Sequence, residues 1–309
     1  MEKIVIGYLC GNAKLSKEDQ VFLDIAKEKN IELVILNTAT DMSEGEIEEK
    51  ATSCDLIFNN TAGEIALEVA KTLEELGKYV IENSKVYYYT ENKWMFYVKC
   101  RKNKIPTPKT ILLPYRFIGV KKELAQFNQW PVILKKASGE QGQFVEKAEN
   151  IGEAIRIIEK FWEKSEDRVP IIAQEFIRSK SYRVTVVGDK ILQAVLKDGH
   201  GWKATGMYAE KLQKFEIDEK LEKLVQRIIK TAKINICGID FMKQNENWLA
   251  VEINAEPSFE LIEEDTEKIV SEVLDFLIKQ IEERRVKSAL FQDKSSQKPE
   301  FELMVNQHK

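Results

Sequence analysis

Short apolar runs alternate with helical segments through the first 88 residues, and this alternation most strongly constrains the fold. Four of the runs read as buried strands, at residues 3–10, 31–37, 54–60 and 78–83. Strands that alternate with helices favour a parallel, doubly wound sheet. Residues 1–88 are therefore predicted to form an N-terminal α/β lobe.

The pattern changes near IPTPKT (105–110), where the prolines disfavour helix. Short strands and helices then alternate without the regular spacing of the first lobe. Two β-hairpins are predicted, at 181–197 with a Gly188-Asp189 turn and at 238–254 with a turn at Asn245–Asn247. Helices are predicted near residues 92–102, 152–164, 218–233 and 264–284. The resulting division has a central α+β lobe, a C-terminal α+β lobe and a mobile tail, at residues 89–174, 175–288 and 289–309.

The composition excludes several kinds of chemistry. The only histidines are His200 and His308, so a multi-histidine metal site is excluded and a catalytic histidine would have to be His200. The four cysteines lie far apart without CxxC spacing, which indicates neither a zinc site nor a disulfide framework and favours a reducing cytoplasm. A net charge of −4 gives no reason to expect nucleic acid or a membrane as partner, and no apolar run is long enough to span a bilayer.

The hairpin at 238–254 carries the strongest candidate site. Glu252 and Asn254 lie two residues apart on one predicted strand and so point to the same face. Asp240, on the neighbouring strand, can reach that face. Two carboxylates and an amide oxygen suit magnesium. A polar strand face exposed to solvent is the alternative, but the apolar flanking residues disfavour it.

Two further segments suggest a nucleotide site. Residues 131–145 place Lys135 on a strand before a loop with Gly139 and Gly142, whose backbone amides could wrap phosphate oxygens. The GxxxxGK[ST] spacing of a phosphate-binding P-loop is absent. The strand at 171–177 ends in QEFI and could bind adenine through its backbone. Taken singly, these segments could also be a plain hairpin and a core strand.

The order of the motifs is more specific than any one of them. Asn92-Lys93, IPTPKT, the lysine strand with its glycine loop, QEFI, YRVTVVG and EINAEPSFE follow one another along the chain. This run, over roughly residues 90–262, resembles the ATP-grasp enzymes and, among them, the RimK-like ligases. The resemblance implies an N-terminal lobe followed by two α+β lobes that clamp ATP between their sheets.

The resemblance also implies roles for individual residues. Lys93 and Lys135 would contact ATP, the loop with Gly139, Gln141 and Gly142 would close over the phosphates, and the adenine would lie against Gln174, Glu175, Phe176 and Ile177. Asp240, Glu252 and Asn254 would bind one or two magnesium or manganese ions. Arg183 would face the substrate or the γ-phosphate, and Lys203 would neutralise phosphate or acyl-phosphate charge, with surface salt bridging as the alternative for both. Three positions depart from the usual pattern, where Phe144 replaces a glycine, Ser181 an aspartate and Thr205 an asparagine.

The implied reaction joins a carboxylate to an amine through an acyl phosphate, with release of ADP and phosphate. The implied partners are ATP, a small acid or peptide carboxylate, and an amine or hydroxyl acceptor, in an enzyme that forms a dimer or tetramer. Within the same fold, the chain could instead crosslink a ribosomal precursor peptide. A phosphotransferase resembling inositol phosphate kinases would need a denser cluster of lysine and arginine, and a non-catalytic nucleotide-binding module would not need the complete metal set.

Overall fold

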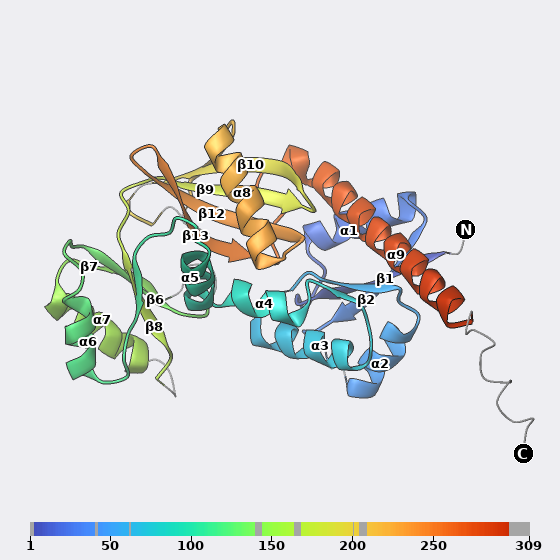
Figure 1. Ribbon diagram of the computed structural model, residues 1–309, viewed down its shortest axis with the longest axis horizontal. Helices are drawn as coiled ribbons and strands as arrows, with labels where there is room; N and C mark the ends of the chain where they lie inside the picture. The colour runs from blue at the N-terminus through green and yellow to red at the C-terminus, as the bar shows by residue number, and fades with distance from the viewer. Residues whose placement is uncertain are drawn as a thin grey trace, which may run out of the picture.

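The structure is a computed structural model that describes residues 3–40, 43–61, 63–139, 144–163, 168–199, 201–203 and 209–296. These residues form three β-sheets, each covered by helices, and the sheets define an N-terminal, a central and a C-terminal lobe (Figure 1). Residues 140–143 and 204–208, which include parts of two predicted loops, lie outside the described residues.

The N-terminal lobe is a four-stranded parallel sheet, as predicted, and its strand order is β2-β1-β3-β4. Its strands are β1 (Ile4–Cys10), β2 (Ile31–Asn37), β3 (Leu56–Asn59) and β4 (Val80–Ile81). The helices of this lobe are α1 (Lys17–Glu28), α2 (Glu44–Thr52) and α3 (Gly63–Glu75). A capping box between Ser16 and Asp19 begins α1, because each side chain accepts a backbone N–H of the other residue. Helix α1 packs on one face of the sheet, and α2 and α3 pack on the other.

The central lobe is an antiparallel sheet with the order β5-β8-β6-β7. Its elements are β5 (Thr110–Leu112), α6 (Phe117–Leu124), β6 (Val132–Lys136), β7 (Val145–Ala148), α7 (Ile151–Glu163) and β8 (Ile171–Glu175). Val132 and Leu134 point into the core beneath α6 and α7. Because side chains alternate along a strand, Ile133 and Lys135 point to the opposite face, toward the C-terminal lobe.

The C-terminal lobe is an antiparallel sheet with the order β11-β10-β9-β12-β13. Its strands are β9 (Ser181–Val187), β10 (Lys190–Asp198), β11 (Lys211–Lys214), β12 (Ile236–Gln244) and β13 (Asn247–Asn254). Both predicted hairpins are present, and their turns contain Gly188 and Asn245 at positive φ. One face of the sheet packs against α8 (Glu219–Ala232), α4 (Ser84–Glu91) and α5 (Lys93–Lys102). The packing thus places residues 89–102 with the C-terminal lobe, whereas the predicted division gave them to the central lobe.

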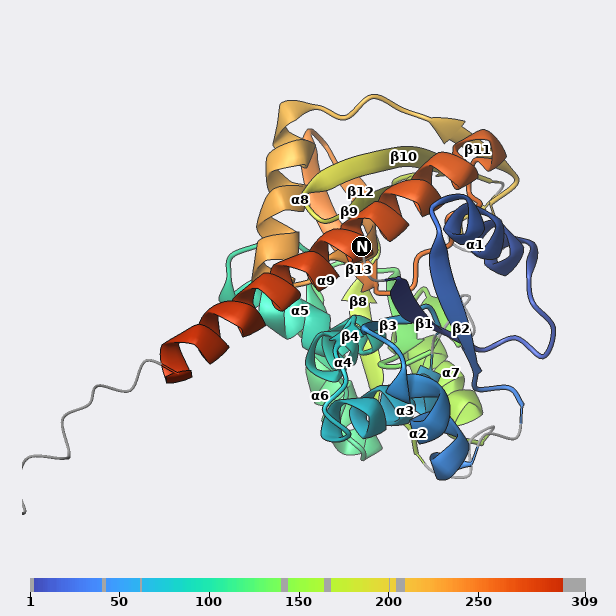
Figure 2. The ribbon, with the colours of Figure 1, turned by 90° about the vertical axis from the view of Figure 1, so that its right-hand side faces the viewer.

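A long helix, α9 (Thr266–Ser296), follows a short 3-10 turn (Glu263–Asp265) and joins the first and third sheets (Figures 1 and 2). Its Val270 and Leu274 share one core with Tyr8 of β1 and Ile236 of β12. The helix continues through Ser296, so the prediction of a tail that begins at residue 289 was wrong. None of the helices in the described ranges has the length and apolar content needed to cross a membrane.

Candidate active site

A cleft between the central and C-terminal lobes contains every predicted site residue that the structure describes. These residues are Lys93, Lys135, Gly139, Gln174, Glu175, Phe176, Ile177, Arg183, Lys203, Asp240, Glu252 and Asn254. Gln141 and Gly142, predicted for the phosphate loop, lie outside the described residues. The fold therefore brings predicted site residues together that are up to 161 positions apart in the sequence, from Lys93 to Asn254.

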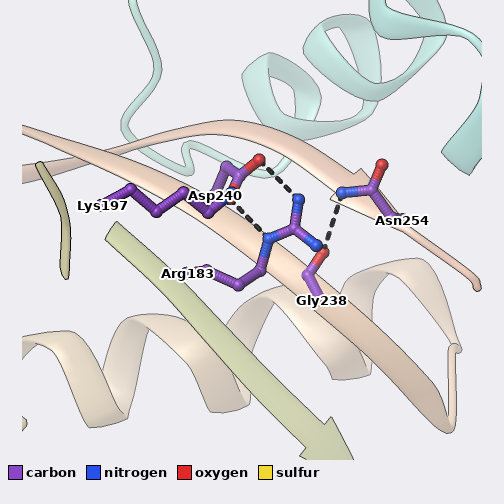
Figure 3. A network of polar contacts seen from close by, with 5 residues as sticks. All are labelled: Arg183, Lys197, Gly238, Asp240 and Asn254. Carbon is purple, nitrogen blue, oxygen red and sulfur yellow. Dashed lines mark hydrogen bonds and ion pairs between the residues drawn. The ribbon is translucent and has the colours of Figure 1, made fainter. Parts of the chain in front are cut away.

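The acidic hairpin has the predicted orientation. Asp240 on β12 and Glu252 on β13 are direct register partners, and a β-bulge follows Asp240. Asn254, two residues beyond Glu252, points to the same face, where its Nδ2 donates to the Gly238 carbonyl at 3.4 Å (Figure 3). This contact turns the Asn254 Oδ1 away from Gly238. The three predicted metal ligands therefore line one face of the cleft.

Asp240 is held by two cations (Figure 3). Arg183 donates from Nε to Oδ1 at 2.6 Å and from Nη2 to Oδ2 at 2.8 Å, and Lys197 Nζ lies 3.0 Å from Oδ1. Burial alone would raise the pKa of Asp240, but the charges and hydrogen bonds of Arg183 and Lys197 hold it well below its usual range. Asp240 is therefore ionised and fixed in orientation.

Lys197 is a residue next to the site that sequence reasoning missed, as it also missed the cleft-lining Glu91, Trp202 and Glu256. Its side chain is 4% exposed, and burial lowers its pKa despite the opposing effect of the Asp240 carboxylate. It lies opposite Ser181 in the β9–β10 ladder, and therefore on the same face as Arg183. Counting outward from the predicted Gly188-Asp189 turn would have paired Lys197 with Lys180, on the other face, because a β-bulge between Ile191 and Gln193 shifts the register by one residue.

Gly238 makes room for the Arg183 side chain. A Cβ atom at position 238 would lie 2.7 Å from Arg183 Nη1, 2.9 Å from its Cδ and 3.0 Å from Pro257 Cβ. These distances are shorter than van der Waals contact. The absence of a side chain at this position is thus required for the guanidinium to reach Asp240.

Lys93 links the second carboxylate to the glycine loop. Asn92 caps α5 by accepting the Met95 N–H, so that Lys93 is the first residue of the helix. Its Nζ lies 2.9 Å from Glu252 Oε1 and donates to the Gly139 carbonyl at 2.6 Å. The side chain of Lys93 therefore spans from β13 to the start of the loop that was predicted to cover the phosphates.

Lys135 lies on the opposite wall of the cleft. Its Nζ donates to Gln174 Oε1 at 2.8 Å, and Gln174 Nε2 donates to Thr110 Oγ1 at 3.0 Å. Burial lowers the pKa of Lys135 to about 8, and the nearby charge of Glu252 opposes this effect. The side chain of Gln174 is thus engaged in orienting a cation.

Apolar side chains form the remainder of the cleft. Ile133 precedes Lys135 by two residues on β6, and Met242 follows Asp240 by two residues on β12, so each strand presents an apolar and a charged residue on one face. Phe176 and Ile177, in the segment that joins the two sheets, also line the cleft. An apolar slot that leads to charged groups suits a flat base attached to phosphates.

Lys203 and Phe144 are described residues that adjoin two of the predicted loops in the sequence. Lys203 Nζ lies 3.9 Å from Glu146 Oε1 on β7, so it reaches across from the C-terminal to the central lobe. Phe144 has a φ of 53°, a conformation that glycine adopts without strain. Its ring packs edge-on against Phe161, and Lys136 Nζ lies 3.5 Å from the ring centroid. These contacts explain how a phenylalanine holds a conformation that favours glycine.

The donor set in the cleft fits a hard divalent cation. The described residues contain no group of three histidine, cysteine or acidic side chains placed to bind a metal. Among the cleft residues, the carboxylates of Asp240 and Glu252 and the amide oxygen of Asn254 would hold such a metal. Oxygen donors on one face suit magnesium, which retains water and phosphate ligands.

Comparison with known proteins identifies the family. The model of the RimK-like ATP-grasp domain matches residues 90–277, more than half of the chain. The chain belongs to the RimK-like ATP-grasp family. A probable alpha-L-glutamate ligase from Haemophilus influenzae is 23% identical over 226 residues, which cover 71% of this chain and 73% of that protein. The predicted family is therefore confirmed.

Solved structures agree on the fold. A RimK domain ATP-grasp protein from Sphaerobacter thermophilus has a TM-score of 0.70 at 16% identity, covering 87% of this chain and 98% of that one. A D-alanine–D-alanine ligase from Bacillus anthracis complexed with ATP has a TM-score of 0.69 at 20% identity, covering 92% and 99%. The ATP-grasp fold is thus confirmed, and the chain is an ATP-dependent ligase of the carboxylate–amine class.

Proposed function

We propose that this ATP-grasp ligase activates a substrate carboxylate as an acyl phosphate and transfers the acyl group to an amine. The observation that supports this most directly is the composition of the cleft. Its walls bring the basic side chains of Lys93, Lys135 and Arg183 together with the oxygen donors of Asp240, Glu252 and Asn254. Cations beside oxygen ligands for a divalent metal suit a polyphosphate that binds together with its metal ion.

In this proposal the adenine occupies the apolar slot beside Phe176 and Ile177, and the phosphates extend toward Lys93 and Lys135. Magnesium or manganese bound to Asp240, Glu252 and Asn254 would neutralise charge on the phosphates during transfer. Lys197 holds the Asp240 carboxylate in position, while the guanidinium of Arg183 faces the region where the γ-phosphoryl group and the substrate carboxylate meet.

The reaction itself requires no nucleophile from the protein. A substrate carboxylate oxygen attacks the γ-phosphorus in line, the bond to the β–γ bridging oxygen breaks, and ADP leaves. The amine then attacks the acyl carbon and displaces phosphate. Lysine and arginine side chains stabilise the charge that develops on the phosphoryl oxygens, which agrees with the scarcity of histidine.

For the amine, L-glutamate is the first candidate, because relatives are named as glutamate ligases. Small acids and peptides with a free carboxylate are the candidates for the activated partner. Comparing ADP release with small acids and with peptides would distinguish a small-molecule ligase from an enzyme that modifies a peptide.

The test is ADP release by the purified chain with magnesium, L-glutamate and a panel of carboxylates, compared with Glu252→Ala. We expect ADP release to require both an acid and an amine, and Glu252→Ala to reduce it by about a hundredfold or more. Glu246→Ala is the matched control, because Glu246 lies in the turn of the same hairpin with its side chain 87% exposed. It should leave the rate unchanged.

Fluorescence of a labelled nucleotide measures ATP binding separately from ADP release, and so distinguishes loss of nucleotide binding from loss of turnover. Glu252→Ala should still bind ATP, since the cations remain. Unchanged ADP release by Glu252→Ala, or phosphate transfer to a polyol in the absence of any amine, would contradict the proposal.

A further inference from the structure

Charge is unevenly distributed along this chain. Residues 92–122 contain nine lysines and arginines and no aspartate or glutamate, although the whole chain has 51 acidic residues and a net charge of −4. Lys93 pairs with Glu252 in the cleft. The other eight are Lys99, Arg101, Lys102, Lys104, Lys109, Arg116, Lys121 and Lys122, and within the described parts of the chain none of them forms a salt bridge. A cluster of this kind has a strong local positive potential.

Most of these cations are on the surface. All except Lys93 and Lys99 are exposed. The segment that carries them runs from the last turn of α5, which packs on the C-terminal lobe, through the extended stretch and β5 into α6 of the central lobe (Figure 1). The apolar face of α6 packs on the central core, so its charged face points away from the cleft. This surface is therefore separate from the candidate active site.

Exposed apolar side chains lie among the cations. Ile118 is 84% exposed and Tyr115 is 62% exposed, the former being among the most exposed large apolar residues described. Ile118 shares a face of α6 with Lys121 and Lys122, because residues three and four apart on a helix are neighbours. Arg168 stacks on the Tyr115 ring at 4.6 Å and donates to the Tyr115 carbonyl, which fixes this part of the surface.

We propose that the exposed side chains of residues 101–122 form a docking surface for an acidic polypeptide segment that also contains apolar side chains. The partner's carboxylates face the lysines of α6, and one of its apolar residues packs on Ile118 and Tyr115. Charge complementarity supports the acid, and the exposed isoleucine supports the apolar anchor. The proposal concerns binding only, so it holds whether or not the bound segment is also a substrate.

A peptide fits this surface better than a nucleic acid. Seven of the nine cations are lysine and two are arginine, whereas arginine is the residue that binds phosphates in a bidentate manner. Aliphatic side chains such as Ile118 and Leu112, the latter 37% exposed, gain nothing from a phosphodiester backbone. A polypeptide offers carboxylates and aliphatic groups together.

The test is fluorescence anisotropy of a labelled peptide in which glutamates alternate with leucines and tyrosines, titrated with the full chain. Lys121→Glu combined with Lys122→Glu should weaken binding by about tenfold or more, and added salt should weaken binding to the native chain. The matched control combines Lys220→Glu with Lys230→Glu, two exposed lysines on α8 that give the same change in net charge. It should bind like the native chain.

The apolar part of the proposal has its own variants. Ile118→Ser should weaken the peptide several-fold, whereas Ile65→Ser, at a site on α3 that is 66% exposed, should not. If the two double lysine variants lost peptide affinity equally, binding would depend only on the net charge of the chain, and the proposal would be overturned. A polyglutamate peptide or an oligonucleotide that binds as tightly as the mixed peptide would overturn it as well, as would loss of peptide binding through self-association of the chain.

Discussion

Glu82 should make the stability of this ligase depend on pH through a contact between lobes. It lies between β4 and α4 and is fully buried. Its Oε1 accepts the backbone N–H groups of Asn235 and Ile236, each at 2.9 Å, and its Oε2 accepts Asn235 Nδ2 at 3.3 Å. These contacts attach the N-terminal lobe to the beginning of β12, the strand that carries Asp240.

Burial raises the pKa of Glu82 to about 7 from an ordinary value of 4.5, because the three N–H donors only partly replace water around the charge. One pKa unit corresponds to about 1.4 kcal/mol, so the ionised side chain should lower the free energy of unfolding by roughly 3 kcal/mol relative to the protonated one. For an acid whose pKa is raised by folding, the favourable contribution is complete below pH 4.5. It declines as the pH rises and is lost above pH 7.

Glu82→Gln isolates this effect, since the amide oxygen can still accept both backbone N–H groups while the charge is removed. Urea unfolding should be measured at intervals from pH 5 to pH 8 for the native chain and the variant. The stability of Glu82→Gln relative to the native chain should rise by roughly 2–3 kcal/mol over this range. Taking the difference matters because burial also raises the pKa of Glu18 to about 7, which affects both proteins equally.

Glu48→Gln, at an exposed position on α2, serves as the control and should show no such trend. A difference between Glu82→Gln and the native chain that stays constant with pH would show that the buried carboxyl titrates normally. A difference that falls with pH would show that the ionised carboxylate stabilises the contact. Either result would refute the reasoning.

Two further predictions concern the cleft. Gly238→Ala should displace Arg183, reduce ADP release by about tenfold to a hundredfold and lower the free energy of unfolding by about 1–3 kcal/mol. Gly45→Ala is the control, because an added Cβ there would meet no atom within 4 Å, and it should leave ADP release unchanged. Because the pKa of Lys135 is lowered to about 8, kcat/KM for ATP should fall as the pH rises above about 8, and Lys135→Arg should abolish this fall. If kcat/KM in Lys135→Arg still fell above about pH 8, a group other than Lys135 would be responsible for the fall.

The sequence predicted the face of each site residue well because strands repeat every two residues. Glu252 and Asn254 had to share a face wherever the strand lay, and the order of the motifs supplied the opposite wall with Lys135. Lys197 was missed because its place depends on pairing across the β9–β10 hairpin rather than on any local motif. Long-range register is a tertiary property, which single residues do not encode.

The errors in the lobe boundaries have a similar cause. Residues 92–102 were predicted to form a helix, but only the folded chain shows that Phe96 of this helix, together with Tyr87, packs beneath β12 and β13. The last turns of α9 were assigned to a tail because residues 289–309 are polar and contain Ser-Ser and Lys-Pro. A helix that extends beyond its core leaves little periodic pattern to recognise.

The arrangement of charges in the cleft separates ATP binding from turnover. Asp240 is held by Arg183 and Lys197, and Glu252 is paired with Lys93, so both acidic residues proposed to bind the metal are oriented by a cation before nucleotide arrives. The cations can then serve the phosphates as well, since an arginine or lysine has more donors than one carboxylate oxygen uses. Removal of an acid would leave a cleft that still attracts ATP, whereas removal of a cation would release the carboxylate from its position. Attraction of the nucleotide thus depends mainly on the bases, and orientation for phosphoryl transfer depends on each acid and its basic partner together.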